Sequence, residues 1–411
     1  MPNISSYEDK KYENVQTQLS NELVELDLLH GEYYLYFNAA EDVNSFNIRY
    51  SFPPVYGNQT PIIMEIVEED TTADIIDYRI ENDINIPNKI VNFTISSINK
   101  GEQKCLHFYY WVLVKNYNYS DLPNVLPIPN KNELPPETTK WLSPTDVVQK
   151  NNIRIKLRAK LMKLTSNDVL SLARNIANFA KNHRYLLFLI QYKLGVYGPQ
   201  DALTALKING ECPGRSHLGS ALFRANNIPA RVVLACPSYK FWFEMHYMVE
   251  YYSGQKYGWI LTEVHQAKTP YEPKNQIIMR ICYPEDENNT QTDFFHSTMT
   301  GMERWVWIEN PYIIPYYKDL KEGSRTRMIN ENEILTEKMP GEYANNLTKE
   351  VFNKYEYYLA MDLTGENLIN FQNAVNYQLK AIDILKDSID AYGYIYWMNE
   401  ANEKYDDIAI I

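Results

Sequence analysis

Residues 207–218 read Lys-Ile-Asn-Gly-Glu-Cys-Pro-Gly-Arg-Ser-His-Leu and set a cysteine, Cys212, between a flexible turn and a proline. Gly210 supplies the turn, and proline is favoured at the first position of a helix. Apolar residues then recur at i, i+3, i+4 and i+7, the spacing of a packed helical face. These residues are Leu218, Ala221, Leu222 and Ala225. Because two asparagines and Pro229 follow, the sequence predicts a helix that begins at or next to Cys212.

A cysteine at the start of a helix lies beside unpaired backbone N–H groups and the positive end of the helix dipole. Such surroundings favour the thiolate, which is the nucleophilic form of the side chain. The same N–H groups can hold the oxyanion that forms when a carbonyl carbon is attacked. The pattern therefore indicates Cys212 as a candidate nucleophile.

Three strands are predicted after this helix. Residues 230–235 form a short apolar run, and residues 243–252 alternate in polarity, with His246 on one face. Residues 257–264 alternate as well and include Glu263. A hairpin turn between the second and third strands sets His246 beside Glu263. If the cysteine helix packs against this hairpin, a nucleophile, a base and a base-orienting carboxylate meet.

The stretch resembles the transglutaminase-like superfamily, which has a papain-like cysteine fold. The matching pieces are Gly210-Glu-Cys212, the run Arg-Ala-Asn-Asn-Ile-Pro-Ala-Arg at 224–231, His246-Tyr-Met-Val-Glu250, and Gly258-Trp259 followed by Glu263. The resemblance implies that Cys212 is the nucleophile, His246 the base and Glu263 the third member of a triad. The family usually has Asp at the third position, and Glu is one methylene longer.

The function that the resemblance implies is that of a cysteine hydrolase, a peptidase or amidase that cleaves peptide or side-chain amides through a thioester. Acyl transfer from protein glutamine to an amine is an alternative within the same fold. A binding or scaffold protein without turnover is the alternative from another class. The implied chemistry needs no cofactor and no metal, and the Cys, His and Glu residues lack the paired spacing of a typical zinc site.

The composition limits the partners and the location. The chain has 411 residues and a net charge of −12, which disfavours nucleic acid and acidic membrane surfaces as partners. The partner that we expect is a peptide or protein substrate. The four cysteines are scattered and do not suggest a disulfide framework. Because the N-terminus lacks an apolar signal core and no run is long enough to span a membrane, a cytoplasmic location is expected.

The N-terminal third predicts an antiparallel β-sandwich, over residues 1–120. Short strands are expected at 32–37, 46–52, 61–67, 75–80, 90–98 and 105–114, with no helix between them. Residues 120–136 then carry five prolines, which is typical of a stiff linker. We place this linker at 121–142.

An α+β core of transglutaminase-like architecture is expected at 143–317. Helical patterns at 169–180, 185–194 and 201–206 precede the cysteine helix, and Trp305–Ile308 is interpreted as a last core strand or a lid. Residues 318–411 are expected to be helical. In this region, apolar residues from Leu368 to Tyr392 repeat with a helical period. They predict one long helix that packs on a domain or on a second subunit, as a homodimer.

Overall fold

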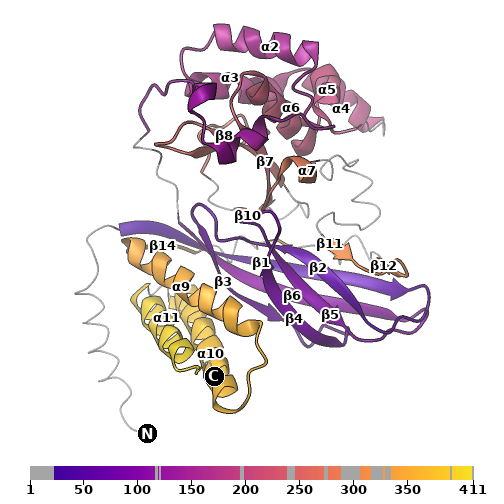
Figure 1. The fold of residues 1–411 in the computed structure, drawn as a ribbon, viewed down its shortest axis with the longest axis vertical. Coiled ribbons are helices and arrows are strands. Elements are labelled where there is room, and N and C mark those ends of the chain that lie inside the picture. Colours follow the sequence, from indigo (N-terminus) through magenta and orange to yellow (C-terminus); the bar gives the residue numbers. More distant parts are fainter. Residues whose placement is uncertain are drawn as a thin grey trace.

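The computed structural model describes residues 23–115, 119, 122–194, 199–237, 246–272, 276–287, 306–315, 327–328, 335–388 and 391–409. Antiparallel strands form the N-terminal part, a helical layer and a separate four-stranded sheet form the centre, and three helices form the C-terminal part (Figure 1). The predicted α+β class is confirmed. Among these residues, no helix combines the length and the apolar character needed to cross a membrane.

The N-terminal strands pack as two antiparallel sheets. They are β1 (Leu23–Ala39), β2 (Phe46–Phe52), β3 (Gln59–Ile66), β4 (Ile75–Asn82), β5 (Lys89–Ile95) and β6 (Gln103–Lys115). One sheet has the order β12-β1-β6-β3 and the other β11-β2-β5-β4. Aromatic side chains such as Tyr33, Phe93 and Phe108 fill the space between the sheets. The alternation that predicted these strands is the alternation of buried and outward residues in a sheet.

Four strands from much later in the chain complete these sheets. They are β11 (Val306–Ile308), β12 (Ile313–Pro315), β13 (Arg327–Met328) and β14 (Leu335–Pro340). The interpretation of 305–308 as a core strand or lid is wrong, because β11 pairs with β2. The other three pair with β1. The boundaries 1–120, 121–142, 143–317 and 318–411 stay a prediction, although strands of the last two ranges join the sheets of the first.

The core consists of helices packed on a four-stranded sheet. The helices are α2 (Ile153–Leu164), α3 (Val169–Asn182), α4 (Tyr185–Lys193), α5 (Ala202–Ile208) and α6 (Cys212–Ala225). The strands are β7 (Ala230–Pro237), β8 (His246–Tyr252), β9 (Trp259–Thr262) and β10 (Gln276–Ile281), in the order β10-β7-β8-β9. Helix α6 lies on this sheet, where Leu218 and Leu222 pack in one buried cluster with Val249 of β8.

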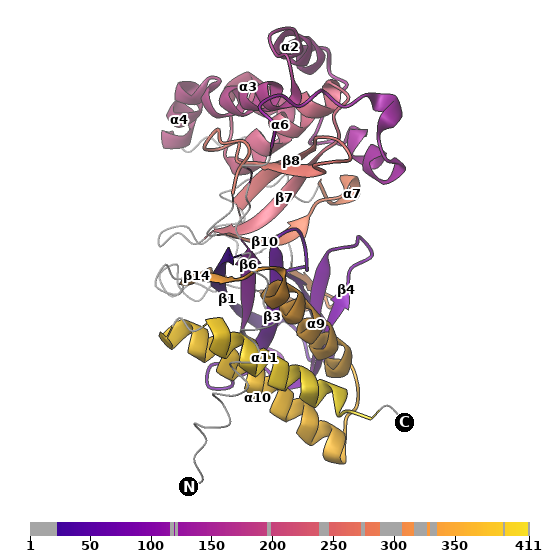
Figure 2. The ribbon, with the colours of Figure 1, turned by 90° about the vertical axis from the view of Figure 1, so that its left-hand side faces the viewer.

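The core meets the sandwich at β10, which lies between the two parts (Figure 2). Two short 3₁₀ helices, η2 (Lys131–Glu133) and η3 (Pro136–Leu142), lie in the proline-rich stretch, and α7 (Pro284–Glu287) follows β10. The side chain of Gln59 donates to the carbonyl of Ile278 (2.7 Å) and accepts from its N–H (2.7 Å). The side chain of Asn88 does the same with Ile281, at 2.8 Å in both directions.

The C-terminal helices cover one face of the sandwich. They are α9 (Gly341–Leu359), α10 (Gly365–Ser388) and α11 (Ala391–Asp406). The expected long helix is confirmed as α10, which covers most of the predicted range, but it ends at Ser388, and Tyr392 belongs to α11, which runs beside it (Figures 1 and 2). Gln378 of α10 donates to the carbonyl of Ile62 in β3 (2.9 Å) and accepts from Tyr405 of α11 (2.6 Å). Helix α10 thus packs within its own chain, and the homodimer stays a prediction.

Candidate active site

The turn before α6 is held by Asn209, which has a positive φ of 89°. Its Oδ1 accepts from the N–H of Gly210 (2.6 Å) and from Nε of Arg215 (3.0 Å). A Cβ on Gly210 would lie 2.8 Å from Oε1 of Gln200, so that a larger residue there would have to displace the Gln200 side chain. The same Oε1 accepts from the N–H of Glu211 (2.9 Å). These contacts set the first residue of α6, Cys212, at the N-terminal end of the helix.

Cys212 and His246 meet as the sequence pattern predicts. His246 is the first residue of β8, and the Cys212 thiol is close enough to its ring to raise the pKa of the imidazole. Nε2 of His246 is hydrogen-bonded to Oε2 of Glu263. Because Glu263 occupies Nε2, Nδ1 is the ring nitrogen left for the thiol. The structure therefore brings all three predicted residues together, with the imidazole between the sulfur and the carboxylate.

The pairing of β8 with β9 explains how Glu263 reaches the histidine. Glu250 lies opposite Leu261, and residues two apart along a strand share a face. Glu263, directly after β9, is therefore on the same face as His246. Its side chain is fully buried, and its second oxygen accepts from the backbone N–H of His265 (2.7 Å).

The electrostatics of the pair follow from this burial. Burial by itself lowers the pKa of His246, but the charge of Glu263 and the hydrogen bond to Cys212 outweigh it and raise the pKa well above its usual value. Burial by itself raises the pKa of Glu263, but the charge of His246 and the hydrogen bonds it receives leave the pKa lowered. The two side chains therefore form an imidazolium–carboxylate pair at neutral pH.

Two residues beside the pair have roles that the sequence did not reveal. Arg215 is buried one helical turn after Cys212, and its Nη1 donates to Nδ1 of His265 (2.9 Å). Burial and the charges of Arg215 and His246 lower the pKa of His265 to about 4, so its ring is neutral at neutral pH. The sequence feature that could have pointed to Arg215 is its i, i+3 spacing from Cys212, which makes the two residues neighbours on the helix surface. His217 is instead fully buried and hydrogen-bonded to the carbonyl of Gln200.

The remaining motif residues meet behind the site. Nε of Arg231 donates to Oε2 of Glu250 (2.8 Å), and its guanidinium lies 3.8 Å from the ring centroid of Trp259. Tyr56, from the sandwich, also donates to Glu250 (2.9 Å). This buried cluster joins β7, β8 and β9 to the sandwich and fixes the strands that carry the histidine and the glutamate.

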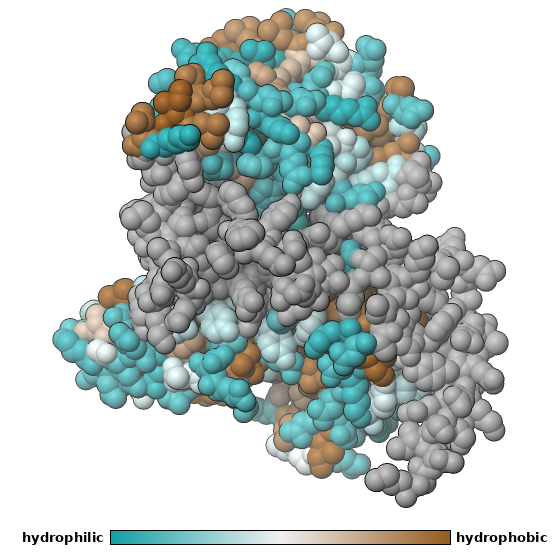
Figure 3. Space-filling view, turned by 180° about the vertical axis from the view of Figure 1, so that it is seen from behind, coloured by the Kyte–Doolittle hydropathy of each residue, from teal (hydrophilic) through white to brown (hydrophobic). Residues whose placement is uncertain are grey.

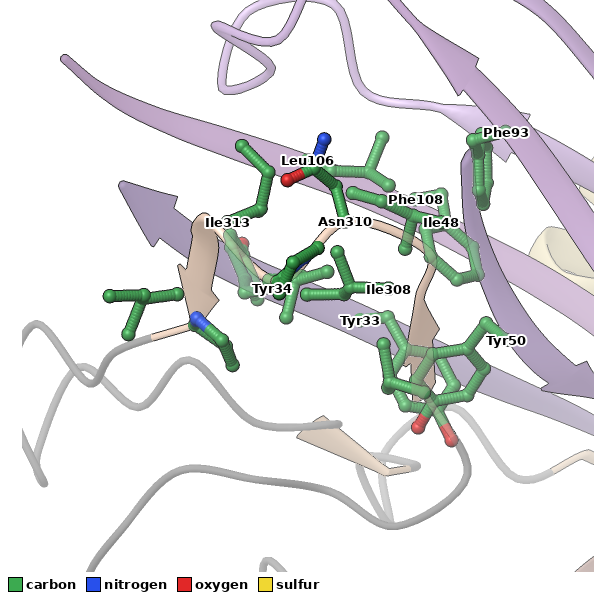
Figure 4. Close-up of a pocket in the computed structure, with 15 residues that line it drawn as sticks. Tyr33, Tyr34, Ile48, Tyr50, Phe93, Leu106, Phe108, Ile308, Asn310 and Ile313 are labelled. Carbon is green, nitrogen blue, oxygen red and sulfur yellow. The ribbon is translucent and has the colours of Figure 1, made fainter. Parts of the chain in front are cut away.

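A cavity of about 430 Å³ lies elsewhere, between the sheets of the sandwich. Tyr33 and Phe108 from one sheet and Tyr50 and Phe93 from the other point into it (Figure 4). None of the three predicted site residues lines it. In the described ranges, no group of three or more His, Cys, Asp or Glu side chains is arranged to hold a metal ion.

The chain is similar to a family model and to a solved structure. No curated protein matches the chain. A solved structure from Cytophaga hutchinsonii, described as a candidate cysteine protease, has a TM-score of 0.48 and 13% sequence identity to it. That alignment covers 74% of this chain and 97% of the other. Residues 156–264 match the family model described as the transglutaminase-like superfamily. The resemblance that the motifs predicted is thus confirmed, and residues 156–264 of this chain form a transglutaminase-like region.

Proposed function

We propose that the protein is a cysteine hydrolase, a peptidase or amidase, in which Cys212 is the nucleophile, His246 the acid and base, and Glu263 the residue that orients His246. One observation carries the proposal: the imidazole of His246 interacts with the Cys212 thiol, which raises the pKa of the ring, and is paired through Nε2 with a fully buried carboxylate. This order of groups is that of an activated thiol. The match to the transglutaminase-like superfamily supports the same class.

In the proposed reaction, the Cys212 thiolate attacks the carbonyl carbon of a peptide or side-chain amide, and an electron pair moves to the carbonyl oxygen. The backbone N–H of Cys212, in the first turn of α6, donates to that oxyanion. His246 gives its proton to the leaving nitrogen as the C–N bond breaks, which leaves a thioester. His246 then takes a proton from water, the hydroxide attacks the thioester, and the acid product and the thiolate are released.

The buried pair provides the proton that this reaction needs. Because the pKa of His246 is raised, the ring holds a proton at neutral pH. Glu263 is hydrogen-bonded to the histidine and acts through it, which makes it a positioning residue. Its two oxygens, bonded to His246 and to the N–H of His265, hold the ring in one orientation.

Alkylation tests the nucleophile without a known substrate. Iodoacetamide at pH 6.5 should label Cys212 at least about tenfold faster than the other cysteines, because a thiolate next to an imidazolium reacts below the usual thiol range. Cys282 is a matched comparison, since it is fully buried and its pKa is raised well above its usual value by burial. Labelling is measured by peptide mass spectrometry. Equally slow labelling at every cysteine would favour the scaffold alternative.

Turnover tests the reaction class. The wild-type chain and Cys212→Ala are compared on a library of fluorogenic peptide and side-chain amides, with Cys282→Ala as the control. We expect release of product by the wild type and by Cys282→Ala only, and the same melting temperature for Cys212→Ala as for the wild type. Addition of a primary amine separates hydrolysis from acyl transfer. A large yield of amide product in place of acid would show that the protein is a transamidase and not a hydrolase.

A further inference from the structure

Helix α2 has two apolar faces, and only one of them is used inside the chain. Ile155, Ala159 and Met162 are buried against the core. On the opposite side of the helix, four large apolar side chains are exposed to solvent over more than half of their surface. They are Ile153 (65%), Leu157 (56%), Leu161 (57%) and Leu164 (73%). At 3.6 residues per turn these four form one stripe along the helix.

Basic side chains flank this stripe on both sides. Helix α2 reads Ile-Arg-Ile-Lys-Leu-Arg-Ala-Lys-Leu-Met-Lys-Leu, with five basic residues and no acidic one, in a chain of net charge −12. A local excess of positive charge against the net charge of the whole protein is a feature of a surface that meets an acidic partner. Solubility alone does not require these basic residues on α2, because the negative net charge of the protein is spread over the rest of the molecule.

The stripe borders a groove of about 710 Å³ between α2 and α5. Apolar side chains from both helices line it: Leu157, Leu161, Leu203 and Leu206. Four basic residues stand around them: Arg154, Arg158, Arg184 and Lys207. No acidic residue is among the described residues that line the groove. His183 lies there too, and burial lowers its pKa, so that it adds no charge at neutral pH.

The groove is at the end of the molecule farthest from the sandwich. Helix α2 is the outermost element there in both ribbon views (Figures 1 and 2). Hydrophobic side chains also gather at this end in the space-filling view (Figure 3). Nothing in the described part of the chain covers the stripe. A partner can therefore approach this end without displacing any described element.

We infer that the groove between α2 and α5 binds an acidic amphipathic helix of a partner protein. Its apolar side chains lie against the leucines of the groove, and its carboxylates face the basic rim. The exposed stripe spans eleven residue steps, or about 16 Å, which is the length of three turns of a partner helix.

Two other occupants fit the groove less well. A second copy of the chain in the same groove would bring two basic α2 helices together, which like-charge repulsion opposes. A lipid surface is flat and does not fill a concave groove with walls on two helices. The inference does not depend on the proposed hydrolase activity, because no residue of the groove belongs to the proposed triad.

The probe is a fluorescein-labelled synthetic peptide of about 14 residues, long enough to cover the stripe. It carries leucines at i, i+3, i+4 and i+7 and glutamates elsewhere. Anisotropy with the full chain should show binding that weakens as salt is added. A peptide of the same composition, with its leucines spread over all faces, should bind at least about tenfold more weakly.

Two pairs of variants test the rim. Arg154→Glu with Lys207→Glu reverses two exposed charges of the groove, and binding should weaken at least about tenfold. Lys156→Glu with Lys163→Glu makes the same charge change on α2, outside the groove, and should change binding less than about threefold. Equal weakening in the two pairs would show attraction by net charge alone and overturn the inference.

A third variant tests the leucines. Leu157→Ser with Leu161→Ser should weaken binding at least about tenfold and leave the melting temperature unchanged, because both side chains are already exposed. The inference fails if the peptide binds none of the proteins, or binds all of them alike. It also fails if phosphatidylserine–phosphatidylcholine vesicles, but not the peptide, bind in a leucine-dependent way. Sedimentation could instead show that the wild type is a dimer and that the serine variant is not. That result would show that the groove binds a second copy of the chain and not a partner helix.

Discussion

Glu263 is a fully buried carboxylate that stays charged, and two neighbours explain why. His246 supplies a positive charge and a hydrogen bond, and the backbone N–H of His265 supplies a second bond. The residue is Glu where the family usually has Asp, and the added methylene lengthens the reach of the carboxylate to both donors. Arg215 holds the ring of the neutral His265 from the other side (2.9 Å). In the proposed triad, Glu263 can therefore take the place of the usual Asp.

Replacement of Glu263 by Gln should lower the pKa of His246. The charge of Glu263 is the largest effect that raises this pKa, whereas burial, which lowers it, remains after the change. The ring of His246 stays protonated up to its pKa in the folded protein. When this pKa is lowered, the alkaline limb of the pH–activity profile should move to lower pH. The midpoint is measured by NMR titration of isotope-labelled histidine. Glu263→Asp retains the charge and should stay closer to the wild type; identical midpoints in wild type and Glu263→Gln would contradict the pairing.

At the scale of elements, the outer edge of β10 is closed by side chains of the sandwich and not by a strand. Gln59 and Asn88 each bond both the N–H and the carbonyl of one β10 residue, Ile278 and Ile281. An amide side chain has the same donor and acceptor as a backbone peptide group, so it can take the place of a neighbouring strand. The core sheet therefore ends at the sandwich without exposing an unpaired edge.

Gln59→Met should destabilise the protein by about 2–6 kcal/mol. The change keeps the size of the side chain but leaves the buried N–H and carbonyl of Ile278 without their partners, and each orphaned group costs about 1–3 kcal/mol. Urea denaturation measures the loss. Gln103→Met is the matched control, because Gln103 is exposed on β6 and its replacement should change stability by less than about 0.5 kcal/mol. Similar values for the two variants would show that the amide is dispensable.

At the scale of the whole molecule, a buried arginine ties the core to the sandwich. Arg280 of β10 pairs with Asp83, which follows β4 (2.5 Å), and with Asp286 of α7 (3.0 Å). Asn85, from the sandwich, donates to the same Asp286 (3.3 Å). These contacts, with the β10 amides and the Tyr56–Glu250 bond, predict that the two parts unfold together.

Arg280→Met should break this coupling. Two carboxylates would be left facing each other in a mostly buried site, at a cost of about 3–5 kcal/mol. Calorimetry should show one transition for the wild type and two separated transitions for the variant. Arg79→Met is the control, since the Arg79–Asp77 pair is exposed and should contribute less than about 1 kcal/mol. A single transition, unshifted in Arg280→Met, would argue against the coupling.

The predicted homodimer belongs to the same scale. The apolar residues of α10 that suggested it, such as Ile382 and Leu385, are buried in the same cluster as residues of α11 and of the sandwich. Leu368 and Ile369 remain exposed near the start of α10. Sedimentation of the wild type and of Ile369→Glu decides whether this end of the helix joins two chains.

The sequence alone determined what local patterns specify. The strand at 46–52 and the helix start at Cys212 were predicted where the structure has them, because alternation, proline position and helix spacing are properties of neighbouring residues. The meeting of Cys212, His246 and Glu263 was also predicted, although only through the order of the motifs of a known family.

Only the tertiary structure decided which distant segments pair. No local pattern identifies β2 as the partner of β11 or assigns the edge of β10 to Gln59 and Asn88, because backbone and amide groups bond alike with any suitable neighbour. The contact of Arg215 with His265 and the leucine stripe left open on α2 likewise depend on what packs beside each side chain. Burial and charge at a site depend on these neighbours. They come together only in the folded chain and cannot be identified from the order of the residues.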